Sequence, residues 1–106
     1  MNILEFLKEN ILILDGGMGT LLQQKGLGAG EYPELWNISH PDVIKDIHLS
    51  YFKSGSHVIC TNTFGANSLK FSDSELEDII SGALAIAKSA REESGLKNRF
   101  IALDIG

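Results

Sequence analysis

The residues best suited to chemistry in this sequence are short polar side chains and glycines that directly follow apolar runs. Three segments have this character: Asp15-Gly16-Gly17, Thr61-Asn62-Thr63-Phe64, and Asp104. Carboxylate, hydroxyl and amide groups at the end of a buried strand are costly unless they are hydrogen-bonded, which favours a ligand pocket. Glycines let backbone N–H groups approach a ligand without obstruction by a Cβ atom. The three segments are therefore candidates for holding the polar head of a small molecule.

The glycine-rich turn after Asp15 does not match a nucleotide-binding motif. Leu22 stands where the dinucleotide pattern G-x-G-x-x-G needs its third glycine, and no Lys follows as a P-loop requires. A helix that begins near Thr20 would turn its free N–H groups toward a small anion, such as an amino-acid carboxylate. A tight turn that binds nothing explains the same residues equally well. Both interpretations stay open at this point.

The apolar pattern predicts helices that alternate with short strands. Two short helices are expected at residues 3–9 and Thr20–Lys25, and a third between Ser39 as N-cap and Gly55 as stop. A long fourth helix is expected to end at Gly95. It would begin at Ser72 or Ser74, which form overlapping capping boxes with Glu75 and Glu77. Expected strands are 11–14, 58–60 and 100–103, with the first covered on both faces and with a long loop at 26–37. This order predicts βαβ units, a parallel sheet and an α/β fold.

The composition limits the classes of function. The 106 residues carry a formal net charge of −5, which disfavours nucleic-acid binding because clustered Lys and Arg are needed to neutralise phosphates. Apolar runs of four to five residues are far short of the roughly 20 needed to span a bilayer. One cysteine can form neither an internal disulfide nor a cysteine-based zinc site. We therefore expect a cytoplasmic protein without nucleic-acid or membrane partners.

The expected architecture is larger than the sequence. Three parallel strands leave two apolar edges unpaired and offer few helices to cover both faces of the sheet. A doubly wound fold would continue for about two or three more strands, and a closed barrel for about five more. We therefore interpret residues 1–106 as the N-terminal part of a larger domain. The alternative is a small complete α/β domain that dimerises through its sheet edges.

Other candidate residues carry weaker signals. Asn37, beside Trp36 at the end of the expected loop, is a further candidate for ligand binding. The three histidines have no neighbouring Cys or carboxylate in an arrangement typical of a catalytic pair or metal site, so we interpret them as structural. Cys60 lies inside an apolar strand, which is typical of buried packing. No residue is singled out as catalytic or as a metal ligand.

Together these segments resemble the homocysteine S-methyltransferase domain family. The resemblance rests on five stretches in the right order and spacing: 13–20 (ILDGGMGT), 34–37 (ELWN) with His40-Pro41, 54–56 (SGS), 61–67 (TNTFGAN) and 104–106 (DIG). It covers nearly the whole chain, and the pairing of the first and fourth stretches is specific. Within the family, the sequence is most similar to the N-terminal module of bacterial cobalamin-dependent methionine synthases.

The resemblance implies a fold and a reaction. The fold is a (β/α)8 barrel, of which this chain would supply about three strands. In the reaction, zinc binds the sulfur of homocysteine as a thiolate, which takes a methyl group to give methionine. Methylcobalamin charged from 5-methyltetrahydrofolate is the expected donor, and betaine (trimethylglycine), S-methylmethionine and S-adenosylmethionine stay open as alternatives. The family holds the ammonium and carboxylate of the amino acid at positions that match Asp15, Gly16 and Gly17 here. The loop 61–64 and Asn37 match further substrate-side positions.

The sequence departs from a working family member in its metal ligands. The family binds zinc through three cysteines in later segments of the barrel, and those segments are not present here. Cys60 occupies a variable position and is not a zinc-ligand candidate. The resemblance therefore predicts that residues 1–106 alone bind no zinc and transfer no methyl group. Two alternatives are a non-catalytic remnant or small amino-acid-binding module, and a different barrel or doubly wound protein with a similar first loop.

Overall fold

The structure, a computed structural model, describes residues 2–9, 11 and 13–105. Its elements in chain order are α1 (Ile3–Glu9), α2 (Gly19–Gln24), the 3₁₀ helix η1 (Pro33–Leu35), α3 (Trp36–Ser39), α4 (Pro41–Lys53), β1 (Val58–Cys60), α5 (Asp73–Ser94) and β2 (Phe100–Ala102). Helices and strands alternate along the second half of the chain, which confirms the predicted α/β class. Leu12 of the expected first strand and Gly106 of the last motif lie outside the described residues.

The sheet is parallel and follows the order of the chain. β1 pairs with β2 in the register Val58↔Phe100 and Cys60↔Ala102. On the other side of β1, Leu14 forms a parallel bridge with Val58, and the Asp15 N–H donates to the Val58 carbonyl at 2.9 Å. Neighbouring segments thus succeed one another without a change of direction, which is the strand order that a (β/α)8 barrel requires.

The expected first strand is the main departure from the prediction. Residues 11–14 were expected to form a strand covered on both faces, but the pairing is limited to one isolated bridge at Leu14. Ile11 is 84% exposed and Leu14 is 59% exposed. The physical reason is that α4 and α5 cover the other strands from one side, and no described element lies over the opposite side of this segment.

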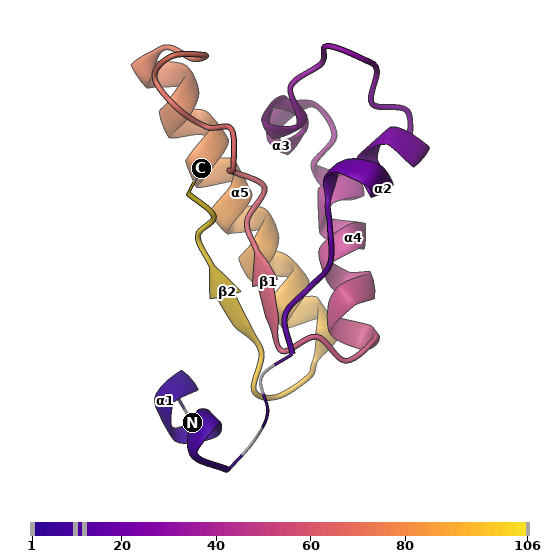
Figure 1. Cartoon of the computed structure of the whole chain (residues 1–106), viewed down its shortest axis with the longest axis vertical. Coiled ribbons are helices and arrows are strands. Elements are labelled where there is room, and N and C mark those ends of the chain that lie inside the picture. Colours follow the sequence, from indigo (N-terminus) through magenta and orange to yellow (C-terminus); the bar gives the residue numbers. More distant parts are fainter. Residues whose placement is uncertain (1, 10, 12, 106) are drawn as a thin grey trace.

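The two long helices build the core against the strands (Figure 1). α4 and α5 pack on each other, α4 packs on β1, and α5 packs on β2. One cluster joins Phe52 of α4, Ile59 of β1, and Ala87 and Ala90 of α5, all fully buried. Small alanines at successive turns let α5 approach the strands closely. Both crossover helices therefore lie on the same face of the sheet.

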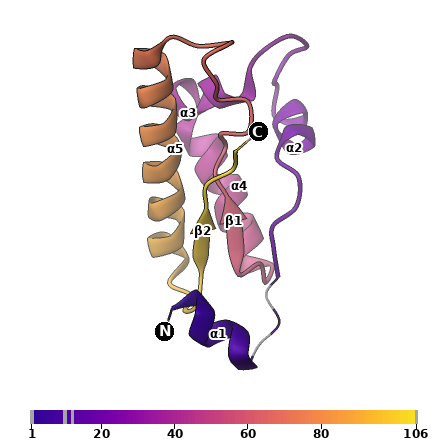
Figure 2. The same ribbon diagram turned by 60° about the vertical axis from the view of Figure 1, so that its left-hand side comes forward.

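The first helix lies at the amino-terminal end of the strands (Figure 2). The Phe6 ring of α1 packs against the His57 ring at 4.9 Å and against the Phe100 ring at 5.8 Å, measured between ring centroids. These contacts join α1 to the residues that begin β1 and β2. The turns that follow the strands are at the other end of the molecule, away from α1.

Two expectations for the connecting segments were wrong. The expected loop 26–37 contains η1 and the start of α3, because Trp36 packs into a core cluster with Leu22 and Ile44 and so fixes the chain there. Ser39 is not the N-cap of the following helix. It ends α3, its hydroxyl donates to the Leu35 carbonyl at 3.3 Å, and His40 occupies the N-cap position of α4 without a side-chain cap.

The ends of α5 follow the prediction more closely. The Ser72 hydroxyl accepts from the Glu75 N–H at 3.3 Å, and the Glu75 carboxylate accepts from the Ser72 N–H at 3.1 Å, which completes one capping box. The second box was wrong, because Ser74 lies inside the helix. Gly95 ends α5 with a φ of +65°, as expected for a glycine stop. Within the residues described above, no helix is both long enough and apolar enough to cross a bilayer.

Candidate functional site

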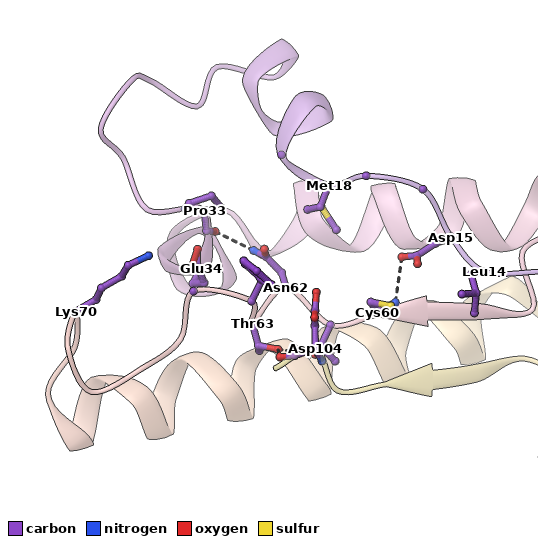
Figure 3. A pocket seen from close by; sticks show the side chains of 16 residues that line it. Leu14, Asp15, Met18, Pro33, Glu34, Cys60, Asn62, Thr63, Lys70 and Asp104 are labelled. Atoms are coloured by element: carbon purple, nitrogen blue, oxygen red, sulfur yellow. Dashed lines mark hydrogen bonds between the residues drawn. The ribbon is translucent and has the colours of Figure 1, made fainter. Parts of the chain in front are cut away.

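The three predicted segments meet at one pocket at the carboxyl ends of the strands (Figure 3). Its volume is about 580 Å³. Eight of the nine predicted site residues line it: Asp15, Gly16, Gly17, Thr61, Asn62, Thr63, Phe64 and Asp104. The parallel strands explain this result, because the turns that follow them open at the same edge of the sheet. Asn37, the ninth, does not line the pocket.

The Asp15 turn is anchored to the next strand. Its Oδ2 atom accepts a hydrogen bond from the Cys60 N–H at 3.0 Å, which holds the carboxylate against the end of β1. Tyr51 of α4 supports the glycines that follow, since its hydroxyl donates to the Gly17 carbonyl at 2.7 Å. A Cβ atom at position 16 would lie 2.8 Å from the Tyr51 hydroxyl oxygen. A larger residue at position 16 would therefore displace the Tyr51 ring from its hydrogen bond to the Gly17 carbonyl.

The thiol of Cys60 remains protonated at neutral pH. Burial, as the largest cause, and the negative charges of Asp15 and Asp104 together raise its pKa to about 11. A thiol binds a metal as the thiolate, so this environment disfavours Cys60 as a ligand. Among the described residues, no group of three or more His, Cys, Asp and Glu side chains is arranged to hold a metal ion.

Two threonines form a closed ring of hydrogen bonds with the backbone of Asp104. The Asp104 N–H donates to the Thr61 hydroxyl at 3.1 Å, and the Thr63 hydroxyl donates to the Asp104 carbonyl at 2.7 Å. The hydroxyl oxygens of Thr61 and Thr63 are 2.8 Å apart. Because the Thr63 hydroxyl already donates its only proton to the Asp104 carbonyl, the Thr61 hydroxyl must donate to Thr63. The ring fixes the main chain that carries the Asp104 carboxylate.

Two buried asparagines hold η1 against the turn after β1. Asn62 Nδ2 donates to the Pro33 carbonyl at 2.8 Å and to Asn37 Oδ1 at 3.1 Å. In return, Asn37 Nδ2 donates to the Asn62 carbonyl at 2.8 Å and to the Ile79 carbonyl of α5 at 3.3 Å. Asn37 thus acts from behind the pocket, where it sets the position of Asn62.

Sequence reasoning missed several residues that line the pocket. Met18 and Pro33 supply apolar surface, and the exposed ring of Phe64 adds to it. Glu34 and Lys70 are the other charged residues of the lining, beside Asp15 and Asp104. Glu34 belongs to the stretch 34–37 that carries the family resemblance, and its signal is a charge directly before the apolar Leu35-Trp36 pair. Nothing in the periodicity singled out Lys70.

The comparisons with known proteins give a family, relatives and a fold. The sequence model described as homocysteine S-methyltransferase matches residues 12–106. The methionine synthase of Mycobacterium tuberculosis is 32% identical over 108 residues, which cover 92% of this chain and 9% of that protein. The methionine synthase of Mycobacterium leprae is 35% identical over 85 residues, or 74% of this chain and 7% of that protein. The chain thus spans less than a tenth of the curated relatives it matches.

Solved structures show the same fold at lower identity. The homocysteine methyltransferase MmuM from Escherichia coli in its metallated form has a TM-score of 0.78 and 22% identity, over 96% of this chain and 40% of that one. Its apo form has a TM-score of 0.74 and 23% identity, over 92% of this chain and 37% of that one. At this level of identity the similarity concerns the fold alone.

Proposed function

The chain belongs to the homocysteine S-methyltransferase family, and from this we propose that it forms the N-terminal part of a homocysteine-binding (β/α)8 barrel that makes methionine. In this reaction the sulfur of homocysteine forms a bond to a methyl carbon while the bond from that carbon to the donor breaks, and the thiol proton is lost. Residues 1–106 would form one part of that barrel. Methyl transfer would need the remainder of it.

The observation that carries the proposal is the single pocket shared by the three strand-end segments. Its lining places the Asp15 turn, the Thr61–Phe64 turn and Asp104 around one space of about 580 Å³. The nine predicted residues remain our candidates for substrate binding, with two modes of action. Asp15, the glycines and Phe64 would contact the amino acid, whereas Thr61, Thr63 and Asn37 would hold the groups that do.

Zinc and the methyl donor are proposed for the complete barrel and not for residues 1–106 alone. The described residues offer no metal cluster, and Cys60 is protonated, so they do not fit a zinc site on their own. We expect the zinc ligands in segments of the barrel other than these. Methylcobalamin charged from 5-methyltetrahydrofolate stays the expected donor, in line with the methionine synthase relatives. The cytoplasmic location also stays a prediction.

Isothermal titration calorimetry on the complete protein that carries this chain tests the proposal. Homocysteine should bind in the presence of zinc, and a chelator should weaken that binding. The control ligand is 2-aminobutyrate, which keeps the amino-acid head but lacks the thiol and should bind more weakly. No zinc-dependent binding of homocysteine would contradict the proposal. Binding without any methyl transfer from the donor would support an amino-acid-binding module instead.

A further inference from the structure

Glu34 is a largely covered residue whose carboxylate lines the pocket and accepts no hydrogen bond from the described residues. Its side chain is only 4% exposed, although it belongs to the short helix η1 near the surface of the molecule. No hydrogen bond or ion pair reaches it from the part of the chain that the structure describes, where Lys45–Glu93 is the recorded ion pair. In the described residues, the fully buried side-chain polar atoms without a partner belong to His48 and Arg99, so the Glu34 oxygens still open onto the pocket that Glu34 lines.

The surroundings keep this carboxylate in the pocket wall. The hydrogen bond from Asn62 to the Pro33 carbonyl, at 2.8 Å, ties the residue before Glu34 to the turn after β1. Gly65 leaves the necessary space, because a Cβ atom at that position would collide with Glu34 Oε1. The carboxylate therefore lines the same pocket as the predicted site residues.

Glu34 and Asp15 lie at opposite ends of the pocket (Figure 3). Asp15 already accepts a hydrogen bond from the Cys60 N–H. Lys70 is the cation of the pocket lining, and Figure 3 shows its side chain extending toward Glu34. The Lys70 ammonium lies close to Glu34, because a Cβ atom on Gly65 would be 3.0 Å from Lys70 Nζ and would also collide with Glu34 Oε1, but the two groups form no ion pair, and the ammonium lies 5.4 Å from the centre of the Tyr32 ring. Glu34 is thus open to a charge from a ligand.

We propose that Glu34 is a second cation-binding carboxylate of this pocket, separate from Asp15, and that it receives an ammonium-type organic cation from one of the two reactants. This inference rests on the proposed function, which brings an amino acid and a methyl donor to the pocket. The cation would be either the α-ammonium of homocysteine or a positively charged group of the donor. A preorganised carboxylate binds such a group without a free-energy cost of rearranging its own side chain.

The test compares two pairs of ligands that differ only in charge, using calorimetry on the complete protein. Homocysteine is paired with 4-mercaptobutanoate, which lacks the ammonium, and trimethylglycine is paired with 3,3-dimethylbutanoate, in which a neutral carbon replaces the quaternary nitrogen. Glu34→Gln should weaken the charged member of one pair by about 10- to 100-fold, the usual weight of a hydrogen bond to a charged group, and leave its counterpart unchanged. The pair that responds identifies the source of the cation.

Glu31→Gln is the matched control, because Glu31 lies in the same segment outside the pocket and accepts from the Gly28 N–H at 2.8 Å. It should leave all four affinities unchanged. Thermal unfolding gives a second readout, since Glu34→Gln removes no hydrogen bond of the described residues and should leave the Tm equal to that of the wild type. A lower Tm, an equal loss of affinity for both members of each pair, or no change in any affinity would overturn the role of Glu34 but not the proposed function. Failure of the wild-type protein to bind homocysteine would overturn the proposed function with it.

Discussion

At the scale of single residues, the pocket gathers negative charge around a thiol. Asp15 touches the Cys60 N–H, and Asp104 is held nearby by the threonine ring. Both carboxylates raise the pKa of the Cys60 thiol, in addition to the larger effect of burial. The thiol is therefore an unreactive part of the wall at neutral pH, and the carboxylates remain available for positive groups of a ligand.

This arrangement predicts the alkylation behaviour of Cys60. Asp15→Asn removes one negative charge and should lower the pKa of the thiol below its value of about 11, but keep it above 9.0 because burial persists. The rate of iodoacetamide modification at Cys60, followed against pH by mass spectrometry, should reach its midpoint at a lower pH in the variant. Asp104→Asn is the control and should move the midpoint less. An unmoved midpoint in Asp15→Asn would show that the carboxylate does not act on the thiol.

At the scale of elements, the sequence predicted what depends on local patterns. The apolar spacing of α5 and its Ser72–Glu75 cap are complete within the helix itself, so both could be predicted. The first strand could not, because its burial depends on elements that lie over it. The same holds for η1 and α3, which form because Trp36 reaches a core made by distant residues.

The candidate site divides in the same way. Asp15, the Thr61–Phe64 turn and Asp104 were predictable, because parallel strands bring their ends together whatever the detailed packing. The buried state of Glu34 was not, since it depends on Gly65 leaving space across the pocket and on Asn62 holding Pro33. Long-range contacts between side chains leave no periodic trace in the sequence.

The α5 cap gives a prediction at this scale. Ser72→Ala removes the hydroxyl that accepts from the Glu75 N–H and leaves that donor without its partner. The free energy of unfolding should fall by about 1 kcal/mol, the usual contribution of an N-cap side chain. Urea denaturation followed by circular dichroism measures it. Ser74→Ala is the matched control, because Ser74 lies inside the helix and its hydroxyl contacts Ser72 only at 3.4 Å. Equal losses in the two variants would contradict the single capping box.

At the scale of the whole molecule, one side of the sheet is well packed and the other carries exposed apolar side chains. Apolar side chains near the sheet that stay exposed include Ile13 at 51%, Leu103 at 49% and Ile105 at 80%. In the proposed barrel, further strands would cover much of this surface, so the stability of the described residues rests on the α4–α5 side. A buried group on that side should then affect the stability of the entire unit.

His48 is such a group and makes stability depend on pH. It lies in α4, its side chain is fully buried, and neither ring nitrogen has a hydrogen-bond partner among the described residues. Burial lowers its pKa from 6.5 to about 4 in the folded protein. Well above pH 6.5 the ring is neutral in both states, so its titration does not change the stability. As the pH falls from 6.5 toward 4, the unfolded chain takes up a proton that the folded one refuses, so stability is lost.

The free energy of unfolding should therefore be about 2 kcal/mol lower at pH 5 than at pH 7 through this residue alone. Urea denaturation across that range measures the slope, above the pH at which most carboxylates titrate. His48→Leu keeps the site apolar and should flatten the slope, whereas His40→Gln, at an exposed position, should leave it as in the wild type. The same slope in His48→Leu as in the wild type would show that another group takes up the proton. A flattened slope would show that α4 excludes water from its buried face throughout the native state.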